Sequence, residues 1–530
     1  MVFKSQHEDA DIPHNVSLTE FLLSRIDPKY GDEPYIVDSV TEQSLSFNRT
    51  KQLITNVATN LQKEYNVKKA DVVGILMPNL ILYPVAFHGV VLAGGVSTTI
   101  NPLYSEEEVQ RQLQSSGATL LITIQPLLEK SSKALAGTKV SKIFVIAEGD
   151  VKEEGNVLDF KKRLMCPSKQ TLTKVSIQDD DLVCLPFSSG TTGLNKGVML
   201  THRNVISNCI QIQQVDKYTR QDAIVGFLPF FHIYGQVVIM NMGLFNNIKV
   251  VCITQFNFVE FLKAIEKHHV TRVHVVPPVI LAMAKEPVVK KFNLSHVKII
   301  TSGAAPLSEG LANLASRAMN IPVVQGYGMT ESSPVTTMST DKYNRPGSIG
   351  LIMPNCEMKI VNTDDRKTEL GYNQEGELCF RGPNIMLGYL NNKEATDDTI
   401  RDGWLHTGDI GYIDEDGYSY IVDRLKELIK YKGFQVPPAE LEGLLLKHES
   451  VQDCAVVGVP EPGVGELPKA CVVRKKGYEN VTEQQLMDYV AKHVNPQKRI
   501  RIVQFVEAIP KSATGKILRR LLKESPASKL

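Results

Sequence analysis

Residues 249–277 read KVVCITQFNFVEFLKAIEKHHVTRVHVVP and place two short apolar runs on either side of a helical pattern. The runs at 249–254 and 272–277 are rich in β-branched residues and have the length of buried strands, whereas 258–269 has the pattern of a helix. Comparable strand-like runs recur at 120–124, 142–148 and 298–303. Continuous apolar strands that alternate with helices are typical of parallel sheets covered on both faces. The sequence therefore predicts an α/β fold.

The pattern of turns and strand-like runs changes after about residue 340. Turn-forming clusters become dense, and the strand-like pieces at 376–382 and 418–423 are shorter and alternate more. This pattern predicts a β-rich subdomain attached to the large α/β part. A polar joint follows, and a new helix begins after Pro437 and Pro438. We predict a large domain over 1–423, a hinge at 424–427 and a small, mobile α+β domain over 428–530.

The composition is that of an ordinary globular chain, with 530 residues and a net charge of +1. This balance provides no overall attraction to nucleic acid, so we expect none as a partner. The most apolar stretch, 72–96, is interrupted by two prolines, an asparagine and a histidine, which predicts buried core rather than a transmembrane segment. The eight cysteines show no metal-ligand spacing, which indicates buried thiols in a reducing compartment.

The last three residues, Ser528-Lys529-Leu530, match the C-terminal address that the peroxisomal import receptor reads. They follow a loose tail at 524–527. We therefore expect this receptor as a partner and the peroxisome as the location, with the cytoplasm as the alternative.

The stretch SSGTTGLNKG at 188–197 follows a strand-like run. Its glycines let the backbone approach a phosphate, its hydroxyls can donate hydrogen bonds, and its lysine supplies charge. It is not a Walker loop, because Lys196 is followed by Gly197. Taken alone, it fits a phosphate-binding loop and a flexible turn equally well. The candidate residues are Ser188, Ser189, Gly190, Thr191, Thr192, Gly193 and Lys196.

A second motif, QGYGMTES at 325–332, also follows a strand-like run. Tyr327 can lay its ring on a flat base, Thr330 can bind a phosphate oxygen, and Glu331 can hold Mg²⁺ among phosphates. Taken alone, the motif fits a tight turn before a capped helix at least as well.

Two further motifs add charged candidates. WLHTGD at 404–409 puts Asp409 at a predicted strand end, where a carboxylate suits the hydroxyls of a ribose, and Arg424 follows fifteen residues later. PKSATGKILRR at 510–520 puts Lys516 on a loop of small residues before a basic helix. Taken alone, Asp and Arg residues such as Asp409 and Arg424 are more often structural residues of turns. A lysine such as Lys516 is, taken alone, more often a surface residue.

Taken together, these motifs resemble the adenylate-forming enzymes, which include 4-coumarate–CoA ligases, fatty acyl-CoA synthetases and beetle luciferases. They occur in the family's order, and the resemblance covers essentially the whole chain. FFHIYG at 230–235 and KYKGFQV at 430–436 are most similar to the 4-coumarate–CoA ligase branch. The resemblance implies that ATP with Mg²⁺ activates a carboxylic acid as its adenylate, and that coenzyme A then displaces AMP. A medium- or long-chain fatty acyl-CoA synthetase and a luciferase-like monooxygenase are the alternatives.

The resemblance also implies roles for individual residues. The catalytic residues would be His232, Lys430, Gln435 and Lys516. ATP and AMP would contact the 188–193 stretch with Lys196, then Gln325, Gly326, Tyr327, Thr330, Asp409, Arg424, Lys426 (the hinge), Lys430 and Lys516. The acyl group would contact Tyr234, Val238, Ala304, Gln325, Gly326, Thr330, Val335 and Met338. Coenzyme A would contact Lys432 and Gly433, and Glu331 would hold the metal.

The sequence departs from the family pattern at three positions. Asn195 stands where the family usually has proline, which predicts a more flexible loop. Gln255 stands where 4-coumarate–CoA ligases carry a lysine that contacts coenzyme A, and Val238 replaces a serine of their acyl pocket. The loss of that hydroxyl predicts a more apolar pocket, which favours less hydroxylated or aliphatic acids.

Overall fold

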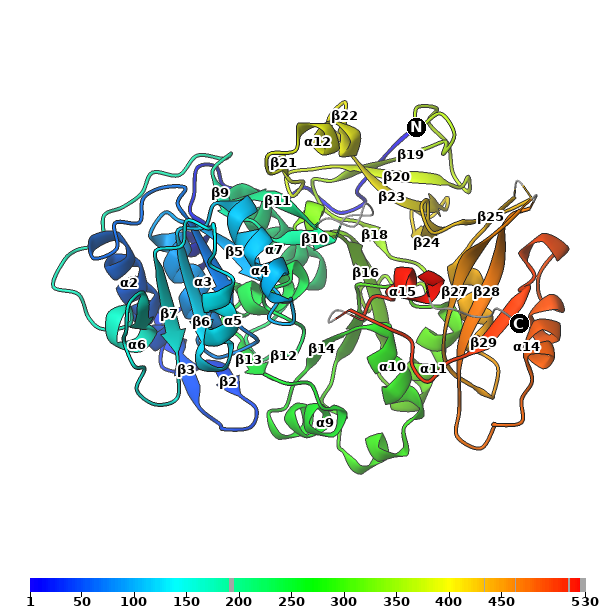
Figure 1. The fold of residues 1–530 in the computed structure, drawn as a ribbon, viewed down its shortest axis with the longest axis horizontal. Coiled ribbons are helices and arrows are strands. Elements are labelled where there is room, and N and C mark those ends of the chain that lie inside the picture. The colour runs from blue at the N-terminus through cyan, green and yellow to red at the C-terminus, as the bar shows by residue number, and fades with distance from the viewer. Residues whose placement is uncertain (190–194, 433, 463, 513–514, 525–530) are drawn as a thin grey trace.

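The computed structural model describes residues 1–530 except 190–194, 433, 463, 513–514 and 525–530. Two large sheets and their helices form the main body, a third sheet lies at its upper edge, and the C-terminal domain lies at one end (Figure 1). The predicted architecture of a large α/β domain with a β-rich part and a smaller C-terminal domain is confirmed.

The first large sheet is parallel through its centre, from β9 to β8, and antiparallel around β11. Side chains of β4 alternate between two cores, with Val73 and Ile75 in one and Leu76 in the other, so helices cover both faces as predicted. The strand order is β10 (Phe187–Ser189), β11 (Asn195–Thr201), β9 (Leu182–Cys184), β5 (Val96–Ile100), β4 (Val72–Leu76), β6 (Leu120–Ile124), β7 (Lys142–Ile146) and β8 (Val157–Asp159), with β21 (Gly388–Tyr389) beside β11.

The second large sheet contains the strand–helix–strand unit read from 249–277. Its strands run parallel from β16 to β2, and antiparallel strands close both edges. The order is β18 (Leu351–Ile352), β17 (Val335–Met338), β16 (Val323–Gly328), β15 (Ile299–Ser302), β14 (Arg272–Val275), β12 (Ala223–Gly226), β13 (Lys249–Cys252), β2 (Pro34–Asp38) and β3 (Ser44–Ser46).

The third sheet is antiparallel and forms the β-rich part. Its order is β1 (Val2–Lys4), β19 (Glu357–Val361), β20 (Gly376–Arg381), β23 (Trp404–Ile413) and β22 (Ile400–Arg401), with β24 (Ser419–Arg424) beside β23. The sequence predicts Asp409 at a strand end, but it lies inside the ten-residue strand β23. Gly408, at a φ of +71°, and the irregular register after Ile410 allow the strand to continue past the predicted turn.

The C-terminal domain has its own sheet and its own core. The sheet order is β26 (Phe434–Val436), β25 (Ile429–Tyr431), β28 (Gly465–Arg474) and β27 (Val451–Glu461), with β29 (Ile502–Phe505) parallel to β28. One apolar cluster lies between Ile429 and Val503, and a second on the other face includes Leu522. The main core, by contrast, runs from Phe3 to Ile413. The two parts thus have separate cores, and the boundaries predicted at 423 and 428 stay a prediction.

Helices connect and cover the sheets. The α-helices are α1 (Leu18–Ser24), α2 (Phe47–Lys63), α3 (Tyr83–Leu92), α4 (Glu106–Ser116), α5 (Leu128–Lys133), α6 (Phe160–Arg163), α7 (His202–Asp216), α8 (Met242–Phe245), α9 (Phe258–Lys267), α10 (Pro277–Lys285), α11 (Glu309–Met319), α12 (Lys393–Thr399), α13 (Pro438–Leu445), α14 (Glu483–Ala491) and α15 (Arg519–Glu524). The other helical turns are η1 (Pro28–Tyr30), η2 (Gln125–Leu127), the π-helix η3 (Tyr234–Asn241), η4 (Pro287–Lys291), η5 (Thr330–Ser332) and η6 (Pro496–Lys498). Among the described helices, none has the length and apolar character needed to cross a membrane.

Buried histidines make the stability of the large domain depend on pH. Burial lowers the pKa of His88, His202 and His274 to about 3, 4 and 3. The unfolded chain, with histidine pKa values of about 6.5, binds more protons than the folded chain below that pH. The free energy of unfolding should therefore fall as the pH drops from 7 to 5, by on the order of 1 kcal/mol for each histidine. Thermal melting between pH 7 and 5 measures how steeply the free energy of unfolding changes with pH. This dependence should be weaker in His88→Gln. An identical slope in that variant would contradict the assignment.

Candidate active site

Asp409 and Arg424 are held together by the β23–β24 ladder. They are direct cross-strand partners, which explains their spacing of fifteen residues. Arg424 donates from Nε to Asp409 Oδ1 at 3.1 Å, and the hydroxyl of Tyr327, at the end of β16, donates to Asp409 Oδ2 at 2.6 Å. The structure thus brings three predicted residues from two sheets to one place, with the Asp409 carboxylate buried between them.

Behind Asp409 lies a buried polar cluster that the sequence did not reveal. Glu377 accepts hydrogen bonds from Arg366 (3.0 and 3.1 Å), from the backbone of Gly408 (3.0 Å) and at 2.9 Å from His406. Burial alone would raise the pKa of Glu377, but His406 and Arg366 outweigh it and lower the pKa to about 2. The cluster fixes the backbone turn that carries Asp409.

Glu377, His406 and Cys379 also lie within 4.8 Å of one another, close enough to share a metal ion. Both Glu377 oxygens, however, already accept from the Arg366 guanidinium. A permanent cation at this position repels a metal cation, so we interpret the cluster as structural support.

Glu331, in η5, is the second buried carboxylate of the site. The hydroxyls of Ser188 and Tyr389 both donate to its Oε1 atom, at 3.0 and 2.8 Å. Lys196 is the cross-strand partner of Ser188 in the β10–β11 pair, and its ammonium lies 4.8 Å from the Tyr389 ring centre. The 188–197 motif and the 325–332 motif therefore meet, because Ser188 bonds to Glu331, which lies 143 positions later in the sequence. Gly190, Thr191, Thr192 and Gly193 lie outside the described residues, and Ser189 is described only as the last residue of β10.

Lys516 belongs to the C-terminal domain but lies against the large domain. A Cβ atom on Gly515 would come within 3.2 Å of Val276, at the turn between β14 and α10. Burial and the Arg424 guanidinium lower the pKa of Lys516, while charges on Glu427, Asp409 and Glu331 act in the opposite direction. The ammonium thus lies within electrostatic reach of both buried carboxylates.

His232 lies just before the π-helix η3 and near Lys516. Its Nδ1 atom accepts from the backbone N–H of Tyr234 at 3.3 Å, so the proton of the neutral ring sits on Nε2. Burial and the charge of Lys516 lower its pKa to about 4. His232 is therefore neutral at physiological pH.

Three of the predicted acyl residues, Tyr234, Ala304 and Gln325, lie at the loop that follows β15. Tyr234 lies over Gly303, whose Cβ position is 2.6 Å from the tyrosine ring, and Ala304 follows at a φ of +68°. Gln325 uses its side-chain amide to fix this loop, through Leu307 at 2.8 and 3.0 Å. The remaining residues lie on the paired strands β16 and β17 (Gly326, Val335, Met338), on η3 four residues after Tyr234 (Val238) and at the start of η5 (Thr330).

Other predicted residues lie at the joint and beyond it. Asp423 accepts from the backbone of Ala439 in α13 at 3.0 Å, and Arg519 donates to Glu427 at 2.9 Å, so both ends of the joint are tied to the C-terminal domain. Lys426 is exposed, as is Lys432, and Gly433 lies outside the described residues. Lys430 and Gln435 are cross-strand partners on an exposed hairpin, and neither hydrogen-bonds to the described part of the large domain.

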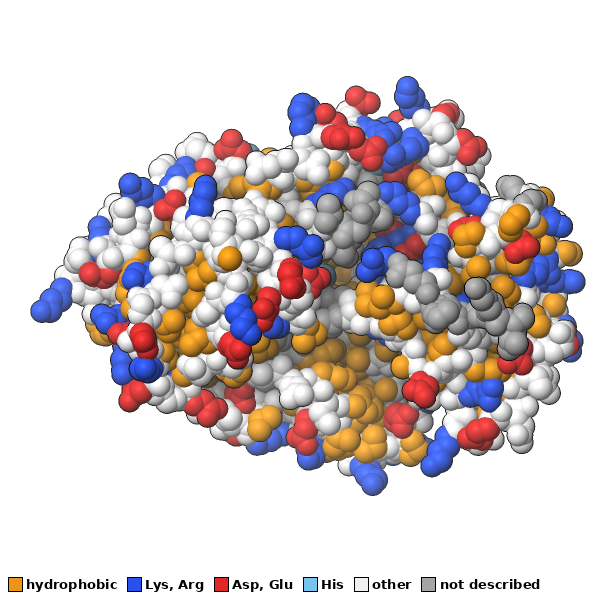
Figure 2. Space-filling model, in the orientation of Figure 1, with side chains coloured by type: hydrophobic (Ala, Val, Ile, Leu, Met, Phe, Trp, Pro, Cys, Tyr) orange, Lys and Arg blue, Asp and Glu red, His pale blue; other side chains and the backbone are white. Residues whose placement is uncertain are grey.

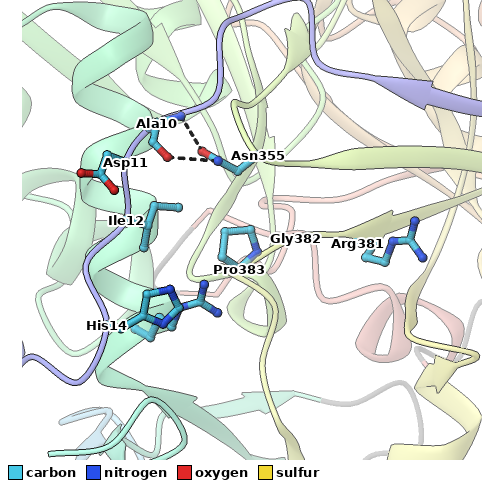
Figure 3. A pocket seen from close by; sticks show the side chains of 9 residues that line it. Ala10, Asp11, Ile12, His14, Asn355, Arg381, Gly382 and Pro383 are labelled. Atoms are coloured by element: carbon cyan, nitrogen blue, oxygen red, sulfur yellow. Dashed lines mark hydrogen bonds between the residues drawn. The ribbon is translucent and has the colours of Figure 1, made fainter.

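A surface cavity of about 530 Å³ lies away from these residues, where the N-terminal segment crosses the large domain (Figure 3). Ala10 and Asn355 exchange two hydrogen bonds at its rim. Three of its charged side chains are paired: His14 and Arg203 both contact Asp179, and Arg381 contacts Glu357. Figure 2 shows a separate hollow near the centre of the face, with Lys and Arg side chains above it and hydrophobic side chains below.

Comparisons with known proteins agree with this geometry. The family model described as AMP-binding enzyme matches residues 24–390, and the model described as AMP-binding enzyme C-terminal domain matches 440–516. The chain therefore belongs to the AMP-binding enzyme family.

Among its relatives, 4-coumarate–CoA ligase 3 of Arabidopsis thaliana is 41% identical over 98% of this chain and 93% of its own length. ATP-bound MatB from Rhodopseudomonas palustris is 26% identical, with a TM-score of 0.88 over 96% of this chain and 99% of its own. Apo MatB, compared over the same shares of both chains, has a TM-score of 0.77.

Proposed function

We propose that this chain is an AMP-forming carboxylate–CoA ligase of the 4-coumarate–CoA ligase type. The observation that carries the proposal is the pair of buried carboxylates, Asp409 held by Tyr327 and Arg424, and Glu331 held by Ser188 and Tyr389. The half-buried Lys516 of the C-terminal domain adds a positive charge whose electrostatics respond to both. A carboxylate oxygen of the acid attacks the α-phosphorus of ATP, and the bond to pyrophosphate breaks. The coenzyme A sulfur then attacks the acyl carbon of the adenylate, and the bond to AMP breaks.

The adenosine half of ATP fits the Tyr327–Asp409–Arg424 group. The Asp409 carboxylate can accept from both ribose hydroxyls while Tyr327 and Arg424 hold it in place. The ring of Tyr327 stacks near the adenine. Gly326 borders the acyl-adenylate directly. Gln325 borders it through the loop that its side chain fixes.

The phosphates fit the region between Ser188 and Lys196 on one side and Lys516 on the other. Lys516 neutralises charge that builds on the α-phosphate as the acid attacks, and no reorganisation is needed at that moment. Thr330, next to Glu331, would bind a phosphate oxygen. His232, which is neutral, orients the reacting carboxyl.

Mg²⁺ fits the Glu331 carboxylate, because it prefers oxygen ligands and binds one or two carboxylates together with substrate phosphates. The two hydroxyls on Oε1 fix the orientation of this carboxylate. When bound, Mg²⁺ neutralises phosphate charge and aligns the leaving pyrophosphate.

Coenzyme A requires a second arrangement of the C-terminal domain. Lys516 must leave after the first step, and a rotation at Lys426 would bring Lys430, Gln435, Lys432 and Gly433 to the site. The higher TM-score with ATP-bound than with apo MatB supports the view that this structure represents the ATP-binding arrangement.

A panel of cinnamates, benzoates and fatty acids tests the function. AMP release that requires the acid, ATP and coenzyme A, with a thioester as product, is expected. Preference for long aliphatic acids would favour the fatty acyl-CoA synthetase. Light emission with oxygen from the adenylate would favour the luciferase-like alternative, and no AMP release with any acid would contradict the proposal.

The acyl pocket provides a prediction at Val238. Because η3 places it on the turn after Tyr234, a serine there would add a polar group to the same wall. Val238→Ser should raise kcat/KM for 4-coumarate several-fold relative to cinnamate and hexanoate, since one neutral hydrogen bond contributes about 1 kcal/mol. Val238→Ala controls for lost volume. An unchanged ratio in the serine variant would mean that Val238 does not contact the acyl group.

For location, we propose peroxisomal import through Ser528-Lys529-Leu530, which lie outside the described residues. Removal of the three residues should leave activity in vitro intact and leave the protein in the cytosol of cells. Fluorescence microscopy with a peroxisomal marker measures this. A truncated chain that still enters peroxisomes would show that the tripeptide is not the address.

A further inference from the structure

Asn195 closes the β10–β11 pair at the end that leads to 190–194, which lie outside the described residues. It is the cross-strand partner of Ser189, and the next rung of the ladder joins Ser188 to Lys196. That next rung carries the hydroxyl and the ammonium that the proposed function assigns to the phosphates of ATP. The placement of the last rung therefore bears on the geometry of the phosphate region.

The Asn195 side chain is tied to a distant part of the large domain. Its amide donates from Nδ2 to the hydroxyl oxygen of Tyr104 at 2.8 Å, across 91 positions of sequence. The proline that the family usually has at this position fixes its own φ angle and has no side-chain donor. This chain thus replaces a local restraint of the backbone by a hydrogen bond to another element. The sequence alone predicts a more flexible loop here, because it does not show that partner.

Tyr104 is itself firmly placed. The ammonium of Lys130, in α5, donates to the backbone carbonyls of Pro102 and Tyr104 at 3.0 and 2.8 Å. Immediately after Tyr104, Ser105 caps α4, and its backbone N–H donates to Glu108 at 2.8 Å. The tyrosine ring packs, partly buried, against an apolar core to which α4 contributes. A bond to this hydroxyl therefore holds Asn195 against a fixed frame.

We infer that Asn195 and Tyr104 are positioning residues for adenylate formation. Their hydrogen bond fixes the last rung of the β10–β11 ladder and thereby holds Ser188 and Lys196 in place for the phosphates of ATP. The inference rests on the proposed function, because it concerns the nucleotide that this function uses. Neither residue needs to contact ATP. Groups that are ordered before binding lose less conformational entropy when the ligand binds, so the hydrogen bond strengthens ATP binding through its neighbours.

The test measures KM for ATP in acid-dependent pyrophosphate release. Asn195→Ala removes the donor, and Tyr104→Phe removes the acceptor while it keeps the ring. Each should raise KM for ATP about fivefold, the usual effect of one neutral hydrogen bond, and should change kcat less. The double variant should show about the same fivefold increase, because either substitution alone already breaks the bond. Two independent effects would instead multiply to about 25-fold.

A second readout separates this role from general support of the fold. Thioester formation from a supplied acyl-adenylate and coenzyme A should keep nearly the wild-type rate in all three variants, because that step involves no β- or γ-phosphate. Structural damage would lower the rates of both half-reactions. Asn195→Pro restrains the backbone by another route, at the first residue of a strand where proline is tolerated, so its KM for ATP should lie below that of Asn195→Ala.

Asn56→Ala is the matched control, because it removes a half-buried amide that donates to the Met165 carbonyl at 2.9 Å. Asn56 belongs to α2, which lies on the side of the large domain away from the C-terminal domain (Figure 1). The control should keep the wild-type KM for ATP. If Asn195→Ala and Tyr104→Phe also keep it, or if their effects multiply in the double variant, the inference is wrong.

Calorimetric titration with ATP in the absence of an acid measures the same effect without turnover. The affinity for ATP should fall about fivefold in each single variant and no further in the double variant. If the wild type binds ATP but forms no CoA thioester from any acid, the proposed function fails, while the titrations still decide whether the hydrogen bond supports ATP binding. The two failures are therefore distinct.

Discussion

Lys516→Ala should lower the rate of adenylate formation by about 10²–10³, which is the usual effect of removing one preorganised charge from a transition state. The structure provides a specific reason. Lys516 is half-buried, and the neighbouring Gly515 lies close to Val276 of the large domain, so the backbone that carries the ammonium is positioned before the substrates react. Pyrophosphate release with ATP and a substrate acid measures this step alone.

The same variant should convert a supplied acyl-adenylate and coenzyme A to the thioester at nearly the wild-type rate. Lys511→Ala is the control, because Lys511 lies on the same loop but pairs with Asp453 of the C-terminal domain at 2.6 Å. Equal losses in both half-reactions would place Lys516 in general support of the fold. If Lys516→Ala forms the adenylate at the wild-type rate, Lys516 is not part of the active site.

The parallel core was predictable because its signal is local. In 249–277 each strand is a run of adjacent apolar residues, and the observed strands and helix fall within the predicted ranges. The position of Asp409 was less predictable, since the WLHTGD motif reads as a turn. Pairing with β20 and β24 keeps the chain extended there, and this pairing depends on segments distant in sequence.

The roles of the site residues came from motif resemblance, and the structure shows which of them lie together. Their supporting contacts could not be read from the sequence. Tyr389 meets Glu331 across 58 positions, and Tyr218 meets His274 across 56. No local pattern marks a tyrosine or histidine whose partner lies on a distant segment of the chain. Such residues look like ordinary core side chains until the sheet order is known.

The second large effect is expected at Asp409. Asp409→Ala should lower kcat/KM for ATP by about 10²-fold or more, mainly through a higher KM, because two hydrogen bonds to a charged group contribute roughly 1.5–3 kcal/mol each. The substitution also leaves the Tyr327 hydroxyl and the Arg424 guanidinium without the carboxylate that both contact.

A comparison of ATP with an analogue that lacks the ribose hydroxyls separates loss of ribose recognition from loss of structure at Asp409. If the carboxylate binds the ribose hydroxyls, wild type should discriminate strongly between ATP and 2′,3′-dideoxy-ATP, and Asp409→Ala should treat the two alike. Asp416→Ala is the control, since Asp416 is an exposed carboxylate just after the same strand that pairs with Arg345 at 2.9 Å. It should retain the wild-type discrimination. If Asp409→Ala still prefers ATP by the wild-type factor, another group must bind the ribose, because a side chain that has been removed cannot distinguish the two nucleotides.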